Sequence, residues 1–369
     1  MPAWSIPRGL IVLLAIAATI VAIAGMKAFA GILGPTFLAL TLTLAVQPVR
    51  QFAVRRGWPA WLAMITAFTA VVAILLALAG ALALSIAQLA TQLPQYTERL
   101  NNLLDNLRRW LADAGVGPDQ VQKALHSLDM GKLVSLLDDI LLGVLGLFSN
   151  LVFVVALLLF MAIDAMSIGQ RIAVVAAERP GIGQALIGFV QGTRKYLLVS
   201  TVFGAIVAVI DGGALWLLGV PLPVLWALLS FITNYIPNIG FVIGVIPPAL
   251  LALLDSGPTL MIWVIVIYSV INFVIQSIIQ PKFVGDAVGL SVTLTFLSLV
   301  FWAWVLGPLG AVLAIPLTLL VKALLLDIDP STRWADVLIG GAMPESEKNA
   351  ADKPAPDSPS SHTSARPSP

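Results

Sequence analysis

The chain has 369 residues, of which 59% are hydrophobic and only 11% are charged, with a net charge of +1. Soluble domains carry roughly 25% charged residues, so this composition excludes a soluble protein and predicts an all-α polytopic membrane protein. The near-neutral charge gives no reason to expect a nucleic-acid partner, and the absence of cysteine excludes disulfides and thiolate metal ligands.

Two apolar stretches of spanning length come first, Leu10 to Met26 and Phe29 to Val46. The first resembles a signal segment, but it is longer than a usual signal h-region and many spans follow, so we interpret it as a transmembrane helix. Short loops rich in arginine stay in the cytoplasm. The following loop, residues 47–59, is of this kind, which predicts a cytoplasmic N-terminus; its arginines are Arg50, Arg55 and Arg56.

The third helix is predicted to be unusually long. Pro59 opens it, where proline is tolerated, and no further proline occurs before Pro94. A continuous helix of that length rises about 50 Å, whereas the hydrocarbon core is about 30 Å thick. We therefore expect this helix to tilt strongly or to project beyond the bilayer. Residues 1–87 form the first unit, of three transmembrane helices.

Residues 88–140 form the one sizeable polar insert, predicted on the periplasmic side. Leucines recur there at helical spacing on both sides of a turn at Gly115 to Pro118, which predicts two amphipathic helices. Such helices can lie on the membrane surface. Alternatively, their leucine stripes make a contact between subunits of a homo-oligomer. The pattern leaves both interpretations open.

The next unit, residues 141–196, contains a fourth span, Leu141 to Ile163, and a cytoplasmic amphipathic stretch. A transport core is predicted over residues 197–326, beginning with a fifth span, Leu197 to Leu218. Asp211 is the sole carboxylate well inside a span. Charges at such depth are costly and usually mark ion or proton pathways, so Asp211 is a candidate proton carrier. The alternative places it near the outer surface, simply hydrated.

An interruption lies in the apolar stretch Leu222 to Leu254. It reads Asn234-Tyr235-Ile236-Pro237-Asn238-Ile239-Gly240. Unpaired backbone groups are costly in hydrocarbon, so a broken helix at membrane depth requires cover by protein or a water-filled cavity. Broken helices whose freed backbone meets a solute are typical of transporter sites. The interruption is therefore a candidate binding site; the alternative is a tight turn between two full spans at the membrane surface.

A polar stripe follows on the sixth span, Thr259 to Ile279, and continues just beyond its end. Asn272, Gln276 and Gln280 recur every four residues and share one helix face. Such a stripe either joins helices by hydrogen bonds or lines a solute pathway. Its position between two interrupted stretches favours the pathway.

The second interrupted stretch is Leu290 to Ala323, and its break contains Gly307, Pro308 and Gly310. Paired broken segments in corresponding positions indicate a binding site. We interpret the two as oppositely directed re-entrant hairpins beside about six full transmembrane helices. Full spans give the same topology. Residues 340–369 have the composition of a disordered cytoplasmic tail.

Several motifs rich in glycine and proline occur in order along the second half of the chain. They are Gly219-Val220-Pro221, Ile236-Pro237-Asn238-Ile239-Gly240, Ile246-Pro247-Pro248-Ala249-Leu250-Leu251-Ala252-Leu253, Gln280-Pro281-Lys282-Phe283-Val284-Gly285, Gly289-Leu290-Ser291-Val292, Gly307-Pro308-Leu309-Gly310-Ala311 and Ala314-Ile315-Pro316-Leu317. Together they resemble the autoinducer-2 exporter family of bacterial membrane proteins, and the resemblance runs from the first span to about Leu326. A proline that is common in the family at Ser291 or Val292 is absent, and Asp211 matches no family motif.

The resemblance implies a multi-pass transporter of the bacterial inner membrane. Some relatives are regarded as exporters of a quorum-sensing furanone and others as cation/proton antiporters. From the residues we expect a secondary transporter, not an enzyme, that exports a small polar molecule; the sequence leaves its coupling to protons open. The alternatives are a sodium/proton antiporter and a non-transporting membrane scaffold. We expect no cofactor and no metal, since the two histidines lie in polar segments. The expected partners are the solute or cation and the lipid bilayer.

Overall fold

The computed structural model describes residues 7–92, 151–237, 239–280 and 290–328, together with single positions between 95 and 146. Nearly all of these residues are helical, and the described part contains no strand. Five of its helices are long and apolar enough to cross a membrane, or six if one bent pair counts as a span. The predicted all-α polytopic membrane fold is thereby confirmed.

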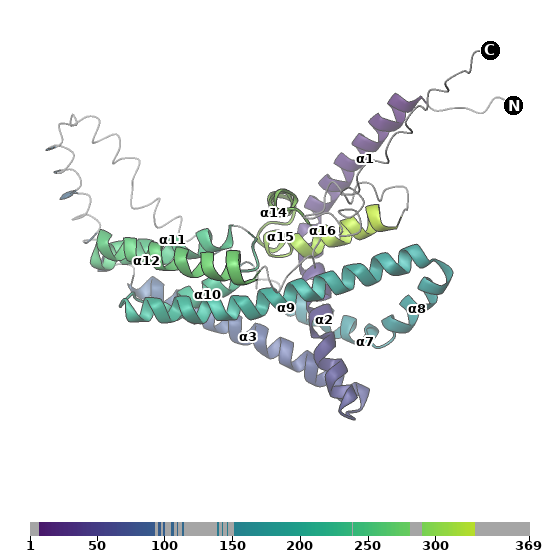
Figure 1. The fold of residues 1–369 in the computed structure, drawn as a ribbon, viewed down its shortest axis with the longest axis horizontal. Coiled ribbons are helices and arrows are strands. Elements are labelled where there is room, and N and C mark those ends of the chain that lie inside the picture. The colour runs from purple at the N-terminus through teal and green to yellow at the C-terminus, as the bar shows by residue number, and fades with distance from the viewer. Residues whose placement is uncertain are drawn as a thin grey trace, which may run out of the picture.

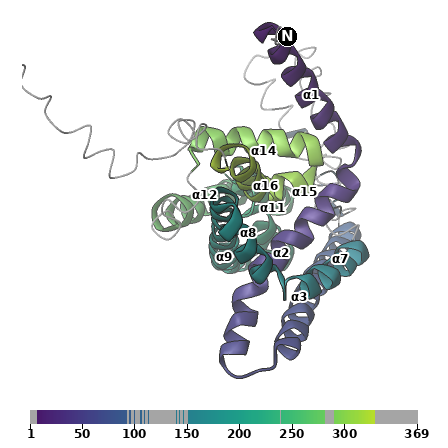
Figure 2. The same ribbon diagram turned by 90° about the vertical axis from the view of Figure 1, so that its right-hand side faces the viewer.

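The first three helices begin close to the predicted starts of their spans. They are α1 (Arg8–Ala28), α2 (Ala30–Arg55) and α3 (Ala60–Gln92). The arginine-rich stretch predicted as a loop, residues 47–59, is helical as far as Arg55, so α2 extends beyond the predicted end at Val46. Helix α1 projects away from the other helices in both views (Figures 1 and 2). Helix α3 is continuous over 33 residues, so it rises about 50 Å as predicted.

Helices α7 (Leu151–Asp164) and α8 (Ile168–Glu178) meet at a bend of 60°. Most of residues 141–150, where the fourth span was predicted to begin, lie outside the described residues. Helix α9 then runs unbroken over 38 residues, Pro180–Leu217. A boundary was predicted at residue 197, but α9 passes through it because no proline interrupts the helix there.

The first interrupted stretch forms two helices, α10 (Pro223–Thr233) and α11 (Gly240–Ser256). Helix α11 packs back against α10 and also against α12 (Pro258–Asn272). A π-helical segment, Phe273–Ile279, continues α12. The result is a helical hairpin followed by a long helix that lies alongside it (Figure 1).

The second interrupted stretch forms three short helices. They are α14 (Val292–Leu306), α15 (Pro308–Val312) and α16 (Ala314–Lys322), with a π-helical turn after them at Ala323–Asp327. Both α15 and α16 pack against α14. This second hairpin lies against α2 and α9 near the middle of the molecule (Figure 2).

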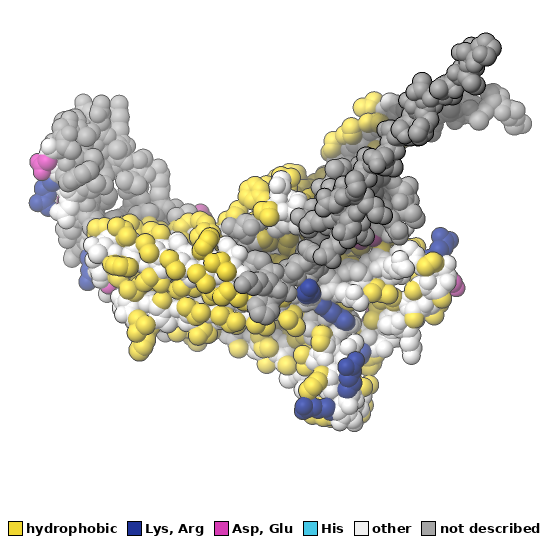
Figure 3. Space-filling view, in the orientation of Figure 1, with side chains coloured by type: hydrophobic (Ala, Val, Ile, Leu, Met, Phe, Trp, Pro, Cys, Tyr) yellow, Lys and Arg dark blue, Asp and Glu magenta, His cyan; other side chains and the backbone are white. Residues whose placement is uncertain are grey.

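The largest core cluster joins α3, α9, α10, α11 and α12. At its centre Trp226 is fully buried, and its indole N–H donates to the Pro221 carbonyl oxygen at 2.9 Å, which satisfies the only polar atom of the ring. Outside this core, large apolar side chains are widely exposed, and Figure 3 shows them covering the face over α11 and α12. An apolar exterior of this extent suits contact with lipid.

Candidate functional site

The first break lies between α10 and α11 and pairs its own backbone groups locally. The Ile236 N–H donates to the Thr233 carbonyl oxygen at 2.8 Å, and the Ile239 N–H donates to the Pro237 carbonyl oxygen at 2.7 Å. Gly240 permits the chain to turn back, because a Cβ built there lies 1.9 Å from the Thr233 oxygen. No other residue type fits at this position without moving backbone.

The second break also depends on glycines that allow the backbone to turn and to approach the preceding helix. Gly307 has a φ of +69°, a left-handed conformation that suits glycine, and Pro308 begins the next helix. A Cβ built on Gly310 lies 1.9 Å from the carbonyl oxygen of Trp302 in α14. Each hairpin therefore depends on a glycine where one helix presses on the backbone of the preceding one.

The first break contacts the second hairpin. Ile236 and Ile239 from the first break pack against the apolar cluster that α14 and α16 form. Leu309 in α15 in turn lies against Gly34 of α2. Asn238, which was predicted to bind solute, lies outside the described residues. The interrupted stretches, about 70 residues apart in sequence, thus meet in one region of the molecule.

A hydrogen-bond network connects three of the predicted polar residues. The Gln276 side-chain nitrogen donates to the Asn234 side-chain oxygen at 3.2 Å and to the Asn272 side-chain oxygen at 2.9 Å. The Asn234 nitrogen donates to the Ser200 carbonyl oxygen at 3.0 Å. Helix α9, the first break and the α12 face are therefore joined by polar contacts. Gln280, half-buried farther along the stripe, has no hydrogen bond to this network among the described residues.

Gln276 lies within the π-helical segment that follows α12. Such segments are uncommon, because π-helical turns are rarely stable, and they occur frequently at functional sites. Of the predicted stripe, Asn272 and Gln276 belong to the network, and Asn272 also donates to the Tyr268 carbonyl oxygen at 2.9 Å.

Asp211 has no exposed surface. One carboxylate oxygen, Oδ2, accepts a hydrogen bond from the Ser230 hydroxyl at 2.5 Å. The other, Oδ1, is buried without a hydrogen-bond partner among the described residues. Simple hydration at the outer surface, the alternative considered from the sequence, does not fit a carboxylate enclosed by helices.

The surroundings of Asp211 link it to the polar network. The Asn272 side chain lies beside the carboxyl group, and Tyr268 is close enough to be affected by its charge. The Tyr268 hydroxyl is likewise buried with no partner among the described residues. Buried polar atoms are usually paired, so these two oxygens, both without a partner among the described residues, are exceptional.

A cavity of about 390 Å³ lies beside the first break. Residues of α2, α3, α7, α9, α10 and α15 line it. Tyr235 from the first break and Leu309 from the second are among the lining residues. Tyr235 and its partner Thr201 were not predicted as site residues, although Tyr235 stands inside the predicted motif.

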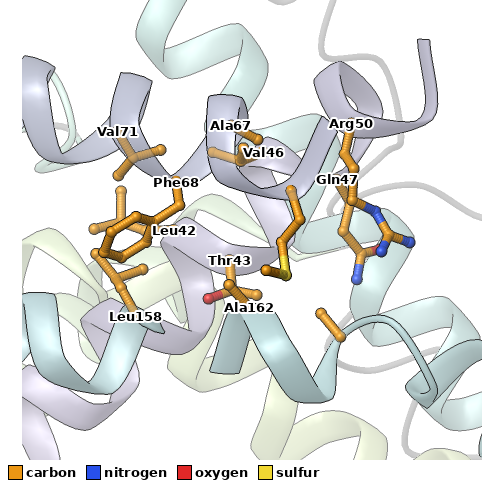
Figure 4. Close-up of a pocket in the computed structure, with 12 residues that line it drawn as sticks. Leu42, Thr43, Val46, Gln47, Arg50, Ala67, Phe68, Val71, Leu158 and Ala162 are labelled. Carbon is orange, nitrogen blue, oxygen red and sulfur yellow. The ribbon is translucent and has the colours of Figure 1, made fainter. Parts of the chain in front are cut away.

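A second cavity, of about 40 Å³, lies between α2, α3 and α7 (Figure 4). Phe68, Leu42 and Leu158 gather at one end, while Gln47 and Arg50 lie at the other. The Nε atom of Arg50 is buried without a partner among the described residues. A space of this size holds water molecules rather than a solute.

Residues 11–329 match the family described as AI-2E family transporter. The chain belongs to this family. The putative transport protein YhhT of Escherichia coli (strain K12) is 30% identical over 341 residues, which is 92% of this chain and 96% of the relative.

Two further relatives of the AI-2E transporter cover similar lengths. A putative transport protein of Haemophilus influenzae is 31% identical over 89% of this chain and 95% of its own length. The AI-2 transport protein TqsA of Escherichia coli (strain K12) is 31% identical over 85% of this chain and 91% of its own length. The resemblance noted from the motifs is confirmed: the protein is an AI-2E family transporter, a multi-pass protein of the inner membrane.

Proposed function

We propose that this AI-2E family transporter is a secondary transporter that exports a small polar molecule. The observation that carries the proposal is that the two broken helices meet beside a hydrogen-bond network of Asn234, Asn272 and Gln276. The relative TqsA is named an AI-2 transport protein, which supports a signal molecule of that type as the solute.

In the proposed site, the network and the first break contact the solute. Asn234, Asn272 and Gln276 supply side-chain amides, and Asn238, in the same break, is proposed to reach the solute as well. Pro237 and Gly240 with Gly307, Pro308 and Gly310 allow the helices to bend. Gln280 is proposed to line the pathway toward the cytoplasm.

We test this site by measuring solute uptake into inverted vesicles that contain the full chain. Gln276→Ala removes both hydrogen bonds at the centre of the network, and the expected loss of transport is about tenfold or more. Gln170→Ala, the same change at an exposed position of α8, serves as the matched control and leaves transport intact. Unchanged transport in Gln276→Ala and Asn238→Ala would contradict the site assignment.

Asp211 is the proposed proton carrier. It is enclosed, one of its oxygens is unpaired among the described residues, and Asn272 connects it to the network. Asp211→Asn keeps the shape and an acceptor for Ser230 but cannot release a proton. We expect this variant to lose accumulation driven by a pH gradient while retaining downhill exchange. If an imposed pH gradient drives the variant as well as the wild type, the coupling role is wrong.

The second candidate function is sodium/proton antiport. The unpaired Asp211 oxygen and Tyr268 hydroxyl, both buried, favour it because oxygen atoms are the ligands that alkali and other hard cations prefer. Collapse of a preformed pH gradient on addition of sodium decides between the two functions. Collapse without solute supports antiport, and its absence leaves export as the function.

The proposed topology keeps both termini in the cytoplasm, with the two hairpins entering from opposite sides. Helices α10 and α16 have 11 and 9 residues and so rise about 16 and 14 Å, roughly half of the hydrocarbon core. These short arms support hairpins rather than full spans. The insert at residues 88–140, mostly outside the described residues, is the proposed contact between copies.

A further inference from the structure

The cavity beside the first break has walls of unusual composition for a polar solute. Among its lining residues, only Thr41, Thr201 and Tyr235 carry a polar side-chain atom. Its volume of about 390 Å³ lies in the range of ligand sites in proteins. The remaining walls are aliphatic apart from Phe231, whose ring meets Tyr235 edge to face at a centroid distance of 5.7 Å.

The hydroxyl protons of these three residues already take part in hydrogen bonds within the protein. Thr41 donates to the Leu38 carbonyl oxygen at 2.8 Å, and Thr201 donates to the Leu197 carbonyl oxygen at 2.7 Å. Thr201 and Tyr235 hydroxyl oxygens are 2.6 Å apart. Because a threonine has one hydroxyl proton, Tyr235 is the donor in this pair. Its own oxygen keeps lone pairs, so the described residues that line the cavity offer an acceptor and no spare donor.

A solute that fits these walls has an apolar body and one hydrogen-bond donor. A solute with many hydroxyls would leave most of them unpaired against aliphatic side chains, which disfavours binding. Asn234, next to Tyr235 in the chain, belongs to the polar network, so a polar end of the solute can lie at the break while its body fills the cavity.

We propose that the exported solute is amphipathic: a small molecule with an apolar body whose hydroxyl or amine donates to Tyr235. This inference rests on the proposed export function and narrows its small polar molecule to one that has an apolar body and a single polar end. A lipid acyl chain could also fill an apolar cavity, but it has no hydrogen-bond donor. A requirement for a hydroxyl group on the bound molecule therefore distinguishes the proposed solute from a lipid chain.

The test uses the full chain in lipid nanodiscs, with 1-naphthol and naphthalene as probes. The readout is the change in the tryptophan fluorescence of the protein as each probe is added. We expect saturable 1-naphthol binding, with naphthalene about fivefold weaker because it lacks one hydrogen bond. Tyr235→Phe should weaken 1-naphthol about fivefold and leave naphthalene unchanged. Ala45→Trp, which fills the cavity, should remove binding of both probes.

Ala70→Trp is the matched control, since it adds the same bulk at an exposed position of α3 that does not line the cavity. Val202→Phe, on the facing wall, is a second filling variant in case Ala45→Trp does not fold. Non-saturable binding, binding that survives both filling variants, or equal affinity for the two probes would overturn the proposal. The proposed function fails separately, if Gln276→Ala vesicles transport normally.

Discussion

At the scale of single residues, two glycines decide whether the hairpins can close. Gly240 and Gly310 each stand where one helix presses on the backbone of the preceding one, and a built Cβ lies 1.9 Å from a carbonyl oxygen in both cases. A flexible side chain can rotate away from such a clash, but backbone has to move with its helix. The two positions are therefore expected to tolerate no larger residue.

Gly240→Ala should lower the free energy of unfolding by about 3 kcal/mol or more, since the methyl group forces Thr233 to shift. Thermal unfolding in detergent measures the effect. The control is Gly213→Ala, because a Cβ at Gly213 has no atom within 4 Å and alanine there should keep or raise stability by up to about 1 kcal/mol. Equal stabilities of the two variants would contradict the close approach.

Asn234 shows how a single residue depends on distant ones. Its side chain was predicted to bind solute, and in the structure it bonds to Gln276, 42 positions away, and to the Ser200 backbone. Residue type and position in a break could be predicted. The partners could not, because they depend on how three helices pack.

At the scale of elements, the start of the insert is attached to the last turn of α11. The Arg99 guanidinium pairs with the Asp255 carboxylate at 3.1 Å, and the Tyr96 hydroxyl lies 3.5 Å from the same carboxylate. Arg99 is 53% exposed at its side chain, whereas Tyr96 is only 2% exposed. The contact therefore combines a buried ring, Tyr96, with an exposed ion pair, Arg99. The contributions of the two residues to stability can be compared.

Tyr96→Ala should lower the free energy of unfolding by about 3 kcal/mol or more, because it removes a buried aromatic ring from the largest core cluster. Arg99→Ala should cost less than about 1 kcal/mol, since exposed ion pairs are weak. Thermal unfolding of both variants makes the comparison. A larger effect of Arg99→Ala would mean that the ion pair, rather than the ring, holds the insert.

The same contact predicts a dependence on alkaline pH. Burial, and then the negative charge of Asp255, raise the pKa of Tyr96 above its usual value of 10.0. The stabilising effect of a raised pKa is fully present below about pH 10 and is lost as the pH rises through the higher folded-state value. The unfolding temperature of wild type should therefore fall more steeply above pH 10 than that of Tyr96→Phe. Parallel curves would exclude a contribution from Tyr96.

At the scale of the whole molecule, several helices line the cavity beside the first break, and α2 contacts α3, α7, α9 and α15 among them. Transport by alternating access requires groups of helices to move against each other around a site. The contact of α2 with α15, where a Cβ on Gly34 lies 3.5 Å from the Leu309 Cβ, is a place to test that movement.

Because the chain contains no cysteine, a disulfide can be introduced without a background of other thiols. A Cβ separation of 3.5 Å is within the range that disulfides adopt, so Gly34→Cys with Leu309→Cys should cross-link on mild oxidation. We expect transport to stop in the oxidised double variant and to return on reduction. Each single variant is the control, and transport that persists after complete cross-linking would exclude movement at this contact.

The amino-acid sequence by itself determined the membrane environment, the helical fold, the long third helix and the places where two helices break. These properties follow from local chemistry: apolar runs of spanning length, and proline and glycine at the breaks. It did not reveal that α9 is one helix from Pro180 onward, since amphipathic and apolar segments can share a helix.

Only the tertiary structure decided which broken segments and polar side chains meet. The contact of Ile236 with the second hairpin, the bond between Asn234 and Gln276, the enclosure of Asp211 and the cavity at Tyr235 all join residues far apart in sequence. The physical reason is that packing between helices sets these distances, and the pattern along any one helix carries no information on which neighbour will face it.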